Sequence, residues 1–191
     1  MLIAFAGLPG TGKTTLSRAL ARRIGAAWIR IDSVEGALCR AGLSFDAIGP
    51  GGYDAAMAVA ADNLANGLGV VADAVNPVEA SRAGWRAVAA RAGCPVLEVE
   101  VVCSDAAEHR RRIEARPDGV PGLPRVTWAW VSGCGYEPWR GERLVIDTAR
   151  LAPEAALDAV VAALPILPRP AREGDHAEQG GGGGPGATDR R

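Results

Sequence analysis

The chain has 191 residues, a length that suits a single domain. Its 21 basic and 22 acidic residues give a net charge of −1, so it lacks the basic excess typical of proteins that hold nucleic-acid backbone. Hydrophobic residues make up 48% of the chain and charged residues 23%, a balance that can bury a core and excludes global disorder.

Short apolar runs alternate with longer segments of helical period along the chain. The predicted strands cover residues 2–6, 27–31, 69–72, 96–102 and 143–146. The predicted helices cover residues 13–24, 33–40, 53–66, 77–92, 106–116 and 153–164. Strands separated by helices predict an α/β fold with a mostly parallel sheet that is covered on both faces.

Two local patterns predict where helices begin. Asn76 followed by Pro77 has the residue types favoured at the N-cap and first helical positions. Asp105 and Glu108 have the spacing of a capping box. From residue 165 the apolar period ends in a Pro- and Gly-rich stretch. We therefore expect one domain over residues 1–164 and a disordered tail over residues 165–191.

The sequence contains few signals that indicate a cellular compartment. The apolar start MLIAFAGLPG is too short for a signal peptide, and no stretch approaches the ~20 apolar residues of a membrane helix. The cysteines are scattered, so neither a disulfide framework nor a zinc site is expected; they are Cys39, Cys94, Cys103 and Cys134. We expect a cytoplasmic protein with no membrane partner.

One contiguous motif carries the strongest functional signal. Residues 7–14 read GLPGTGKT and fit G-x-x-x-x-G-K-[ST], between a predicted strand and a predicted helix. Such glycines let backbone N–H groups point into one concavity, and the helix N-terminus adds positive potential for phosphate. We therefore expect ATP and Mg²⁺ as cofactors. The predicted nucleotide contacts are Gly7, Leu8, Pro9, Gly10, Thr11, Gly12, Lys13, Thr14 and Thr15.

Lys13 is the only lysine of the chain, and every other basic residue apart from the histidines is arginine. This bias indicates that arginine replaces lysine wherever either serves. A compact ammonium reaches the β- and γ-phosphate oxygens better than a broad planar guanidinium. We therefore expect Lys13 to be catalytic, and the Thr14 hydroxyl to be a ligand of Mg²⁺.

Missing motifs narrow the class of nucleotide-binding protein. The guanine-reading motif N-K-x-D needs a second lysine, which the chain lacks. ATPases of the transport and motor types need a strand that ends in Asp-Glu, where the Glu activates water. Here the strand that ends at Asp73 is followed by Ala74 and Val75. The expected phosphate acceptor is therefore a substrate hydroxyl, which favours a kinase.

Two aspartates follow predicted strands at the edge where ligands bind in open parallel sheets. Asp32 is the candidate catalytic residue that accepts the proton of the acceptor hydroxyl; the alternative is a helix cap before Ser33. Asp73 is the candidate partner of Mg²⁺ through water, and the alternative is a simple turn residue.

The segment of about residues 110–127 is predicted to be a helical and loop lid. Arg112 and Arg116 are four residues apart, so one helical face could carry both over the phosphates, although a solvated basic face is the alternative. His109 and His176 are expected to be exposed bystanders. The aromatic residues of 128–139 could wall a pocket, but we expect them to pack the lid against the core.

With these residues in place, the sequence resembles the P-loop small-molecule kinases, and most closely the chloramphenicol phosphotransferase-like group of AAA-domain kinase-like proteins. That group neighbours the gluconate, adenylylsulfate and zeta-toxin kinases. The residues that carry the resemblance are the motif at 7–14, Asp32-Ser33, Gly49-Pro50, Val70–Asp73, Trp85-Arg86, Cys103, Arg112, Arg116 and Ile146–Thr148.

The resemblance implies a P-loop NTPase three-layer α/β/α sandwich with a five-stranded parallel sheet of order 2-3-1-4-5. It also implies Asp32 as the activator of the acceptor hydroxyl and arginines near 112–116 over the phosphates. The chain departs from the group in the acceptor region, residues 35–53 plus Asn76, which matches no antibiotic pocket.

The leading hypothesis is thus an ATP-dependent phosphotransferase that acts on a hydroxyl of a small metabolite or antibiotic-like molecule. A polynucleotide or nucleotide-sugar kinase is an alternative, and the charge of −1 counts against a nucleic-acid partner. The alternative from another class is a non-catalytic nucleotide-binding switch or regulator.

Overall fold

The computed structural model describes residues 1–116 and 119–165. The predicted tail from residue 166 onward, His176 and residues 117 and 118 of the predicted lid lie outside the described residues. Within the described part of the chain, no helix is long and apolar enough to cross a membrane.

Five parallel strands form the central sheet, in the order β2-β3-β1-β4-β5. Their bounds are β1 (Leu2–Ala6), β2 (Ala27–Arg30), β3 (Val70–Asp73), β4 (Val96–Val102) and β5 (Leu144–Asp147). Every residue of β1 and β3 is buried, as expected for central strands of a sheet with both faces covered. The predicted parallel sheet and its strand order are confirmed.

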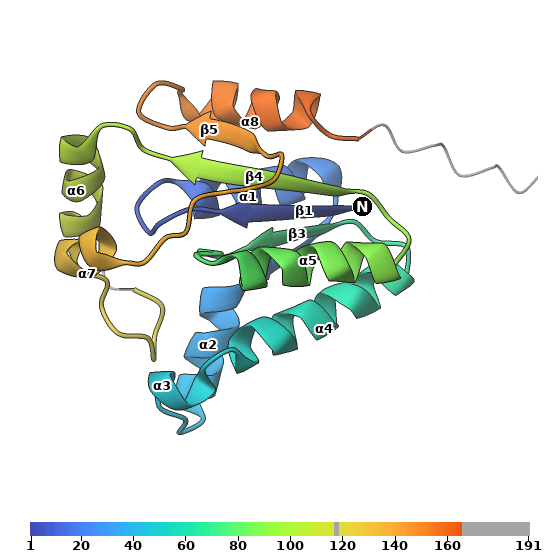
Figure 1. Ribbon diagram of the computed structural model, residues 1–191, viewed down its shortest axis with the longest axis horizontal. Coiled ribbons are helices and arrows are strands. Elements are labelled where there is room, and N and C mark those ends of the chain that lie inside the picture. Colours follow the sequence, from blue (N-terminus) through green and yellow to red (C-terminus); the bar gives the residue numbers. More distant parts are fainter. Residues whose placement is uncertain (117–118, 166–191) are drawn as a thin grey trace, which may run out of the picture.

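Eight helices surround the sheet in the described residues (Figure 1). Their bounds are α1 (Lys13–Ile24), α2 (Ile31–Arg40), α3 (Phe45–Ile48), α4 (Gly51–Ala65), α5 (Glu79–Arg91), α6 (Ala106–Glu114), α7 (Trp128–Gly133) and α8 (Pro153–Ala162). The short helices α3 and α7 fall where the sequence showed no helical period.

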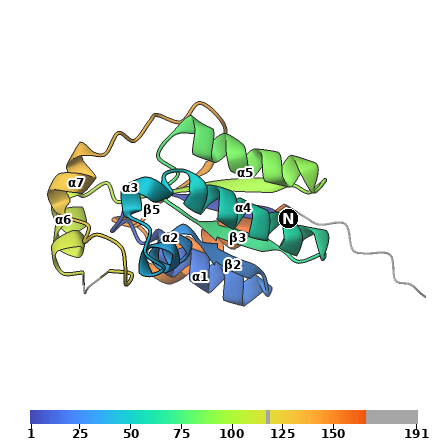
Figure 2. The ribbon, with the colours of Figure 1, turned by 90° about the horizontal axis from the view of Figure 1, so that it is seen from below.

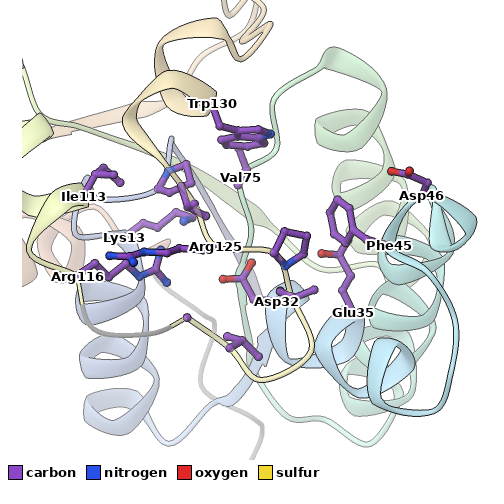
Figure 3. A pocket seen from close by; sticks show the side chains of 16 residues that line it. Lys13, Asp32, Glu35, Phe45, Asp46, Val75, Ile113, Arg116, Arg125 and Trp130 are labelled. Carbon is purple, nitrogen blue, oxygen red and sulfur yellow. The ribbon is translucent and has the colours of Figure 1, made fainter.

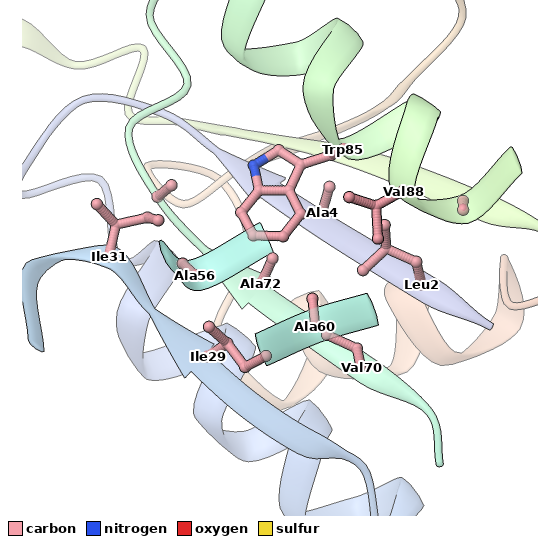
Figure 4. Packing of buried hydrophobic residues seen from close by; sticks show 12 residues of the cluster. Leu2, Ala4, Ile29, Ile31, Ala56, Ala60, Val70, Ala72, Trp85 and Val88 are labelled. Carbon is pink, nitrogen blue, oxygen red and sulfur yellow. The ribbon is translucent and has the colours of Figure 1, made fainter. Parts of the chain in front are cut away.

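Two hydrophobic clusters hold the three layers together. On one face, Trp85 of α5 and Ala60 of α4 pack against Leu2, Val70 and Ala72 of the strands (Figure 4). On the other face, α1 and α8 pack against the same sheet through small and aliphatic side chains; the buried ones are Leu16, Leu20, Ala21, Ala156 and Val160. Helices α4 and α5 lie side by side in both views (Figures 1 and 2).

The carboxyl ends of the strands point toward the edge of the molecule where α2, α3, α6 and α7 lie (Figure 1). The chain enters α2 directly from β2, because Arg30 is both the last strand residue and the N-cap of the helix. Asp32 therefore lies in the first turn of α2. The cap position belongs to Arg30, which removes the alternative that Asp32 caps a helix at Ser33.

The two predicted helix starts have different outcomes. Asp105 caps α6, since its carboxylate accepts from the backbone N–H groups of Ala107 and Glu108. Glu108 does not complete a capping box, because its carboxylate pairs with Arg111 and Arg112 instead. The prediction that Asn76 caps a helix is wrong. α5 begins at Glu79, and Asn76 is buried with a positive φ of 48°.

Asn76 instead connects the layers. Its side-chain amide donates to the carbonyl of Phe5 in β1, and its side-chain oxygen accepts from the indole of Trp85 in α5. These bonds satisfy a buried amide that would otherwise cost free energy. A positive φ is more tolerable for Asn than for most residues, so the residue type fits the sharp turn after β3.

Candidate functional site

The phosphate-loop motif forms the turn between β1 and α1, and its three glycines all have positive φ: 138° at Gly7, 83° at Gly10 and 93° at Gly12. A Cβ at Gly7 would lie 2.2 Å from the carbonyl oxygen of Val101. The loop is therefore built for glycine in both backbone conformation and space. The predicted nucleotide contacts at residues 7–15 form this loop and the first turn of α1.

Lys13 is buried, with 6% of its surface exposed, at the first position of α1. Burial lowers the pKa of Lys13, and the carboxylates of Asp73 and Asp32 oppose that change. The two carboxylates thus favour the charged form of Lys13 beside the loop that would receive phosphate. The sole lysine thus lies where the motif placed it.

Asp73 ends β3 at the same edge and is 1% exposed. Burial raises the pKa of Asp73, and the charge of Lys13 and the hydroxyl of Thr14 oppose the rise. Its Oδ2 atom is buried and has no hydrogen-bond partner in the described residues. An orphaned carboxylate oxygen beside Thr14 suits a hydrated divalent cation, so the residues predicted to bind Mg²⁺ fit that role.

Asp32 lies next to this cluster and is held by a residue that the sequence reasoning missed. The Arg30 guanidinium donates to Asp32 Oδ2 at 2.8 Å, and its Nε lies 3.9 Å from Asp73 Oδ2. Arg30 therefore lies between the two predicted acidic residues. Strand alternation alone gives no signal for this role, because it depends on the pairing of β2 with β3.

The two predicted lid arginines do not share one helical face, because α6 ends at Glu114 and Arg116 lies beyond it. The Arg112 guanidinium donates to the hydroxyl of Thr148 at 2.8 Å and to its carbonyl at 3.1 Å. The same hydroxyl donates to the carbonyl of Thr11 in the phosphate loop at 2.8 Å. Arg112 therefore reaches the loop through Thr148.

Two cavities flank the phosphate loop. The first, of about 380 Å³, is lined by Lys13, Asp32 and Arg116 together with residues of α2, α3 and α7 (Figure 3). The second, of about 300 Å³, is lined by Gly12, Thr15, Arg112 and Thr148 and by the start of α8. The structure thus divides Arg116 and Arg112 between two cavities on either side of the loop.

His109 was expected to be an exposed bystander, and that expectation is wrong. It is 7% exposed, and its Nε2–H donates to the carbonyl of Pro9 in the phosphate loop at 2.7 Å. Its ring meets Trp128 edge to face at a centroid distance of 5.4 Å. His109 thus joins the phosphate loop, α6 and α7, a contact that spans 100 residues of sequence and leaves no local pattern.

The aromatic residues of 128–139 divide between the two predicted roles. Trp128 packs on His109, while Tyr136 and Trp139 lie against the buried guanidinium of Arg82 at 5.0 and 4.2 Å. Trp130 instead lines the first cavity. The expected role of packing the lid against the core therefore fits Trp128, which contacts α6, whereas Tyr136 and Trp139 pack against α5 and Trp130 forms part of a pocket wall.

The predicted acceptor region surrounds the far end of the first cavity. Glu35 of α2, with Phe45 and Asp46 of α3, lines it there. The Tyr53 hydroxyl of α4 accepts from the backbone N–H of Asn76 at 3.1 Å, and burial raises the pKa of Tyr53. Residues of the predicted acceptor segment thus reach the same cavity as Lys13 and Asp32.

The comparisons with known proteins agree with this geometry. The model of a family described as "AAA domain" matches residues 2–125. No curated protein matches the sequence.

Several solved structures are similar to the chain. A candidate kinase from Chloroflexus aurantiacus has a TM-score of 0.67 at 22% identity, and the match covers 86% of this chain and 98% of that one. Mycobacterium tuberculosis APS kinase CysC, in complex with AMPPNP and APS, has a TM-score of 0.62 at 22% identity over 85% and 96% of the chains. Chaetomium thermophilum Kti12, in complex with ADP-AlF3, has a TM-score of 0.61 at 20% identity over 86% and 100%. These similarities confirm the P-loop kinase-like fold.

Proposed function

The chain belongs to the AAA domain family, and we propose that it transfers the γ-phosphoryl group of ATP to a hydroxyl of a small molecule. The observation that carries this proposal is one cavity of about 380 Å³ that Lys13, Asp32 and Arg116 line together. A phosphate-binding ammonium, a carboxylate that can accept a proton and a guanidinium that can balance charge are what phosphoryl transfer to a hydroxyl requires.

The nucleotide would bind with its phosphates in the loop of residues 7–12. Backbone N–H groups of the loop and the N-terminus of α1 would bind the phosphate oxygens. Lys13 would bind the β- and γ-phosphates. The second cavity, beside Gly12, Thr15 and Arg112, has room for the nucleoside on the other side of the loop.

Thr14 and Asp73 would hold Mg²⁺, Thr14 directly and Asp73 through water. When bound, this ion neutralises charge on the phosphate oxygens. The Oδ2 atom of Asp73 supports this assignment: its nearest cationic atom, Arg30 Nε, is 3.9 Å away, and a buried carboxylate oxygen without a hydrogen bond is costly until something binds it.

Asp32 would accept the proton of the acceptor hydroxyl. In that step the hydroxyl oxygen forms a bond to the γ-phosphorus, the bond from that phosphorus to the bridging oxygen breaks, and ADP leaves. The ion pair with Arg30 at 2.8 Å orients the Asp32 carboxylate. Arg116 lines the cavity across from Asp32 and would balance negative charge on the transferred group.

The proposed catalytic unit is residues 1–164, with about residues 110–127 as its lid. An acceptor hydroxyl is favoured over water because Ala74 and Val75 follow Asp73, so no glutamate follows this strand to activate water. The second candidate function is a non-catalytic nucleotide-dependent switch, which the likeness to Kti12 keeps open.

The replacement Asp32→Asn tests the proposal, because it keeps the shape of the side chain and removes the proton acceptor. We expect ADP release stimulated by an acceptor to fall by about 10²–10⁴-fold, the usual range for loss of a general base, with ATP affinity nearly unchanged. The assay is a screen of hydroxylated metabolites and antibiotics with Mg²⁺ and ATP.

Asp62→Asn, at an exposed position of α4, is the matched control and should leave turnover unchanged. Full phosphoryl transfer in Asp32→Asn would contradict the mechanism. ATP binding without ADP release for any acceptor would favour the switch.

A further inference from the structure

Charge is unevenly distributed around the first cavity. In Figure 3, the cationic side chains of Lys13, Arg116 and Arg125 lie on one side, next to the phosphate loop. Glu35 and Asp46 lie at the opposite side, with Asp32 between the two groups. The part of the cavity farthest from the phosphate loop is therefore acidic.

Glu35 is the unusual member of this acidic side. It is 9% exposed, yet its carboxylate has no hydrogen bond and no ion pair with any of the residues that the structure describes. The nearest arginine along its helix, Arg40, donates to the carbonyl of Pro121 instead. Acids with so little exposed surface are commonly paired, and Glu35 lines the cavity, so a ligand that enters the cavity is a natural partner for its carboxylate.

The packing of Glu35 leaves the cavity as the place where that partner must bind. A Cβ at Gly52 would lie 2.5 Å from Glu35 Cγ, so α4 presses against the stem of the side chain. Burial raises the pKa of Glu35 to about 7, and the Asp32 carboxylate acts in the same direction. A cation bound in the cavity would relieve both effects.

The remaining walls at this end are apolar. Phe45, Leu123, Pro124 and Trp130 line the cavity. Phe45 is 43% exposed and Trp130 is 49% exposed, so both side chains keep surface that a ligand can cover. Aromatic faces bind organic ammonium groups and pack on hydrocarbon rings. This combination suits a cationic molecule with an apolar body, and it disfavours an anionic acceptor.

We propose that Glu35 is a specificity-determining residue that binds a protonated amine of the acceptor, which is therefore a small amino alcohol with an apolar or aromatic body. That this molecule accepts a phosphoryl group rests on the proposed function, whereas its binding through the amine does not. Asp32 and Glu35 are three residues apart on α2, about 5–6 Å between Cβ atoms. That spacing matches a hydroxyl and an amine on neighbouring carbon atoms, each bound by one carboxylate.

Matched probes test the proposal. We would titrate the full chain with 2-amino-1-phenylethanol and with 1-phenylethane-1,2-diol, which differ only in an amine and a hydroxyl. A second pair is 2-aminocyclohexanol and cyclohexane-1,2-diol. Binding is followed by NMR without nucleotide, so the result does not depend on catalysis. In each pair we expect the amine to bind about 10- to 100-fold more tightly, the range for a hydrogen bond to a charged group.

The replacement Glu35→Gln keeps the size of the side chain and should abolish the preference for the amine, so that amine and diol bind with about equal affinity. ATP affinity should stay unchanged. Glu154→Gln, at an exposed position of α8, is the matched control and should keep the preference. Equal affinity for amine and diol in both pairs, including an absence of binding by all four probes, would overturn the proposal. So would an amine preference that persists in Glu35→Gln.

Phosphoryl transfer is scored separately, as ADP release with Mg²⁺ and ATP. If the amines bind through Glu35 but no acceptor stimulates ADP release, the proposed function fails and the amine site stands. If ADP release is stimulated by neutral diols as strongly as by the amines, the kinase stands and the amine site fails.

Discussion

The phosphate end and the acceptor end of the cavity are built in different ways. The core of the phosphate end is one continuous stretch, residues 7–14, whose conformation is set by glycines and by contacts with Val101, Thr148 and His109. The acceptor end is assembled from α2, α3, α7 and residues 123–124, which come from two distant parts of the sequence. One end is a local motif, and the other is a product of the tertiary fold.

The polar groups of the two ends also differ. Around the phosphate loop, Thr11, Thr148 and His109 all have hydrogen-bond partners within the chain. At the acceptor end, Glu35 has none in the described residues. These groups of the loop are thus satisfied before a ligand binds, whereas Asp73 Oδ2 and Glu35 would gain partners from the cation and the acceptor that we propose.

The largest expected effect is on the phosphate loop. Gly7→Ala would place a Cβ 2.2 Å from the Val101 carbonyl oxygen at a φ of 138°, so we expect the free energy of unfolding to fall by about 3 kcal/mol or more. Gly25→Ala is the matched control. It also has a positive φ, of 65°, but no neighbour within 4 Å, and should cost only about 1 kcal/mol. Urea unfolding measures both; equal losses would mean that the loop is not rigid.

The next effect concerns the sole lysine. Lys13→Arg keeps the charge but replaces a compact ammonium in a buried position by a broad guanidinium. We expect phosphoryl transfer to fall by about 100-fold. The reverse exchange Arg18→Lys, on the exposed side of α1, should leave turnover unchanged. Undiminished activity in Lys13→Arg would show that the lone lysine is an accident of composition.

A smaller effect is expected at His109, which links the phosphate loop to α7. His109→Phe keeps a ring against Trp128 but removes the donor to the Pro9 carbonyl, and should lower the free energy of unfolding by about 1–2 kcal/mol and weaken ATP binding. Arg110→Gln, at an exposed position of the same helix, should change stability by less than about 0.5 kcal/mol. Thermal unfolding with and without ATP distinguishes the two variants. Unchanged ATP affinity in His109→Phe would separate α6 from the phosphate loop.

The smallest expected effect is a pH-dependent change in the free energy of unfolding at Glu35, in the acceptor end. The pKa of Glu35 is about 7 in the folded chain against 4.5 for a free glutamate, so the folded state binds this proton more tightly. The stability that the folded chain gains by binding this proton is therefore fully present below pH 4.5. It is lost as the pH rises through 7 and the Glu35 carboxyl group ionises. Glu35→Gln should stabilise the ligand-free chain by about 1 kcal/mol at pH 8 and by nothing at pH 4, since the cavity is open to water and screens the charge. Denaturant unfolding at the two pH values measures this, and an equal change at both would contradict an unpaired Glu35.

The sequence predicted the parts of the molecule that depend on local pattern or on sheet topology. The continuous apolar runs of β1 and β3 indicate strands that are buried on both faces. The motif at 7–14 predicts the phosphate loop without any tertiary information. Asp32 and Asp73 were predicted near Lys13 because the carboxyl ends of parallel strands share one edge. The structure places all three at that edge.

The parts that could not be predicted depend on contacts between distant segments. Arg30 lies between two aspartates because β2 pairs with β3, and His109 reaches Pro9 across 100 residues. The helices α3 and α7 are too short to show a period. Asn76 has the residue type of a cap, but its amide is bound between β1 and α5, so tertiary hydrogen bonds override the local preference.

The single lysine also makes the phosphate loop chemically addressable. Apart from the amino terminus, Lys13 carries the only primary amine of the chain, and a lysine-specific protease has one peptide bond to cut. Because Lys13 is buried at the start of α1, acylation or cleavage there requires the loop to open. Mass spectrometry of one modified site would therefore follow the opening of the phosphate loop in the unlabelled protein, and its slowing by ATP would measure nucleotide occupancy.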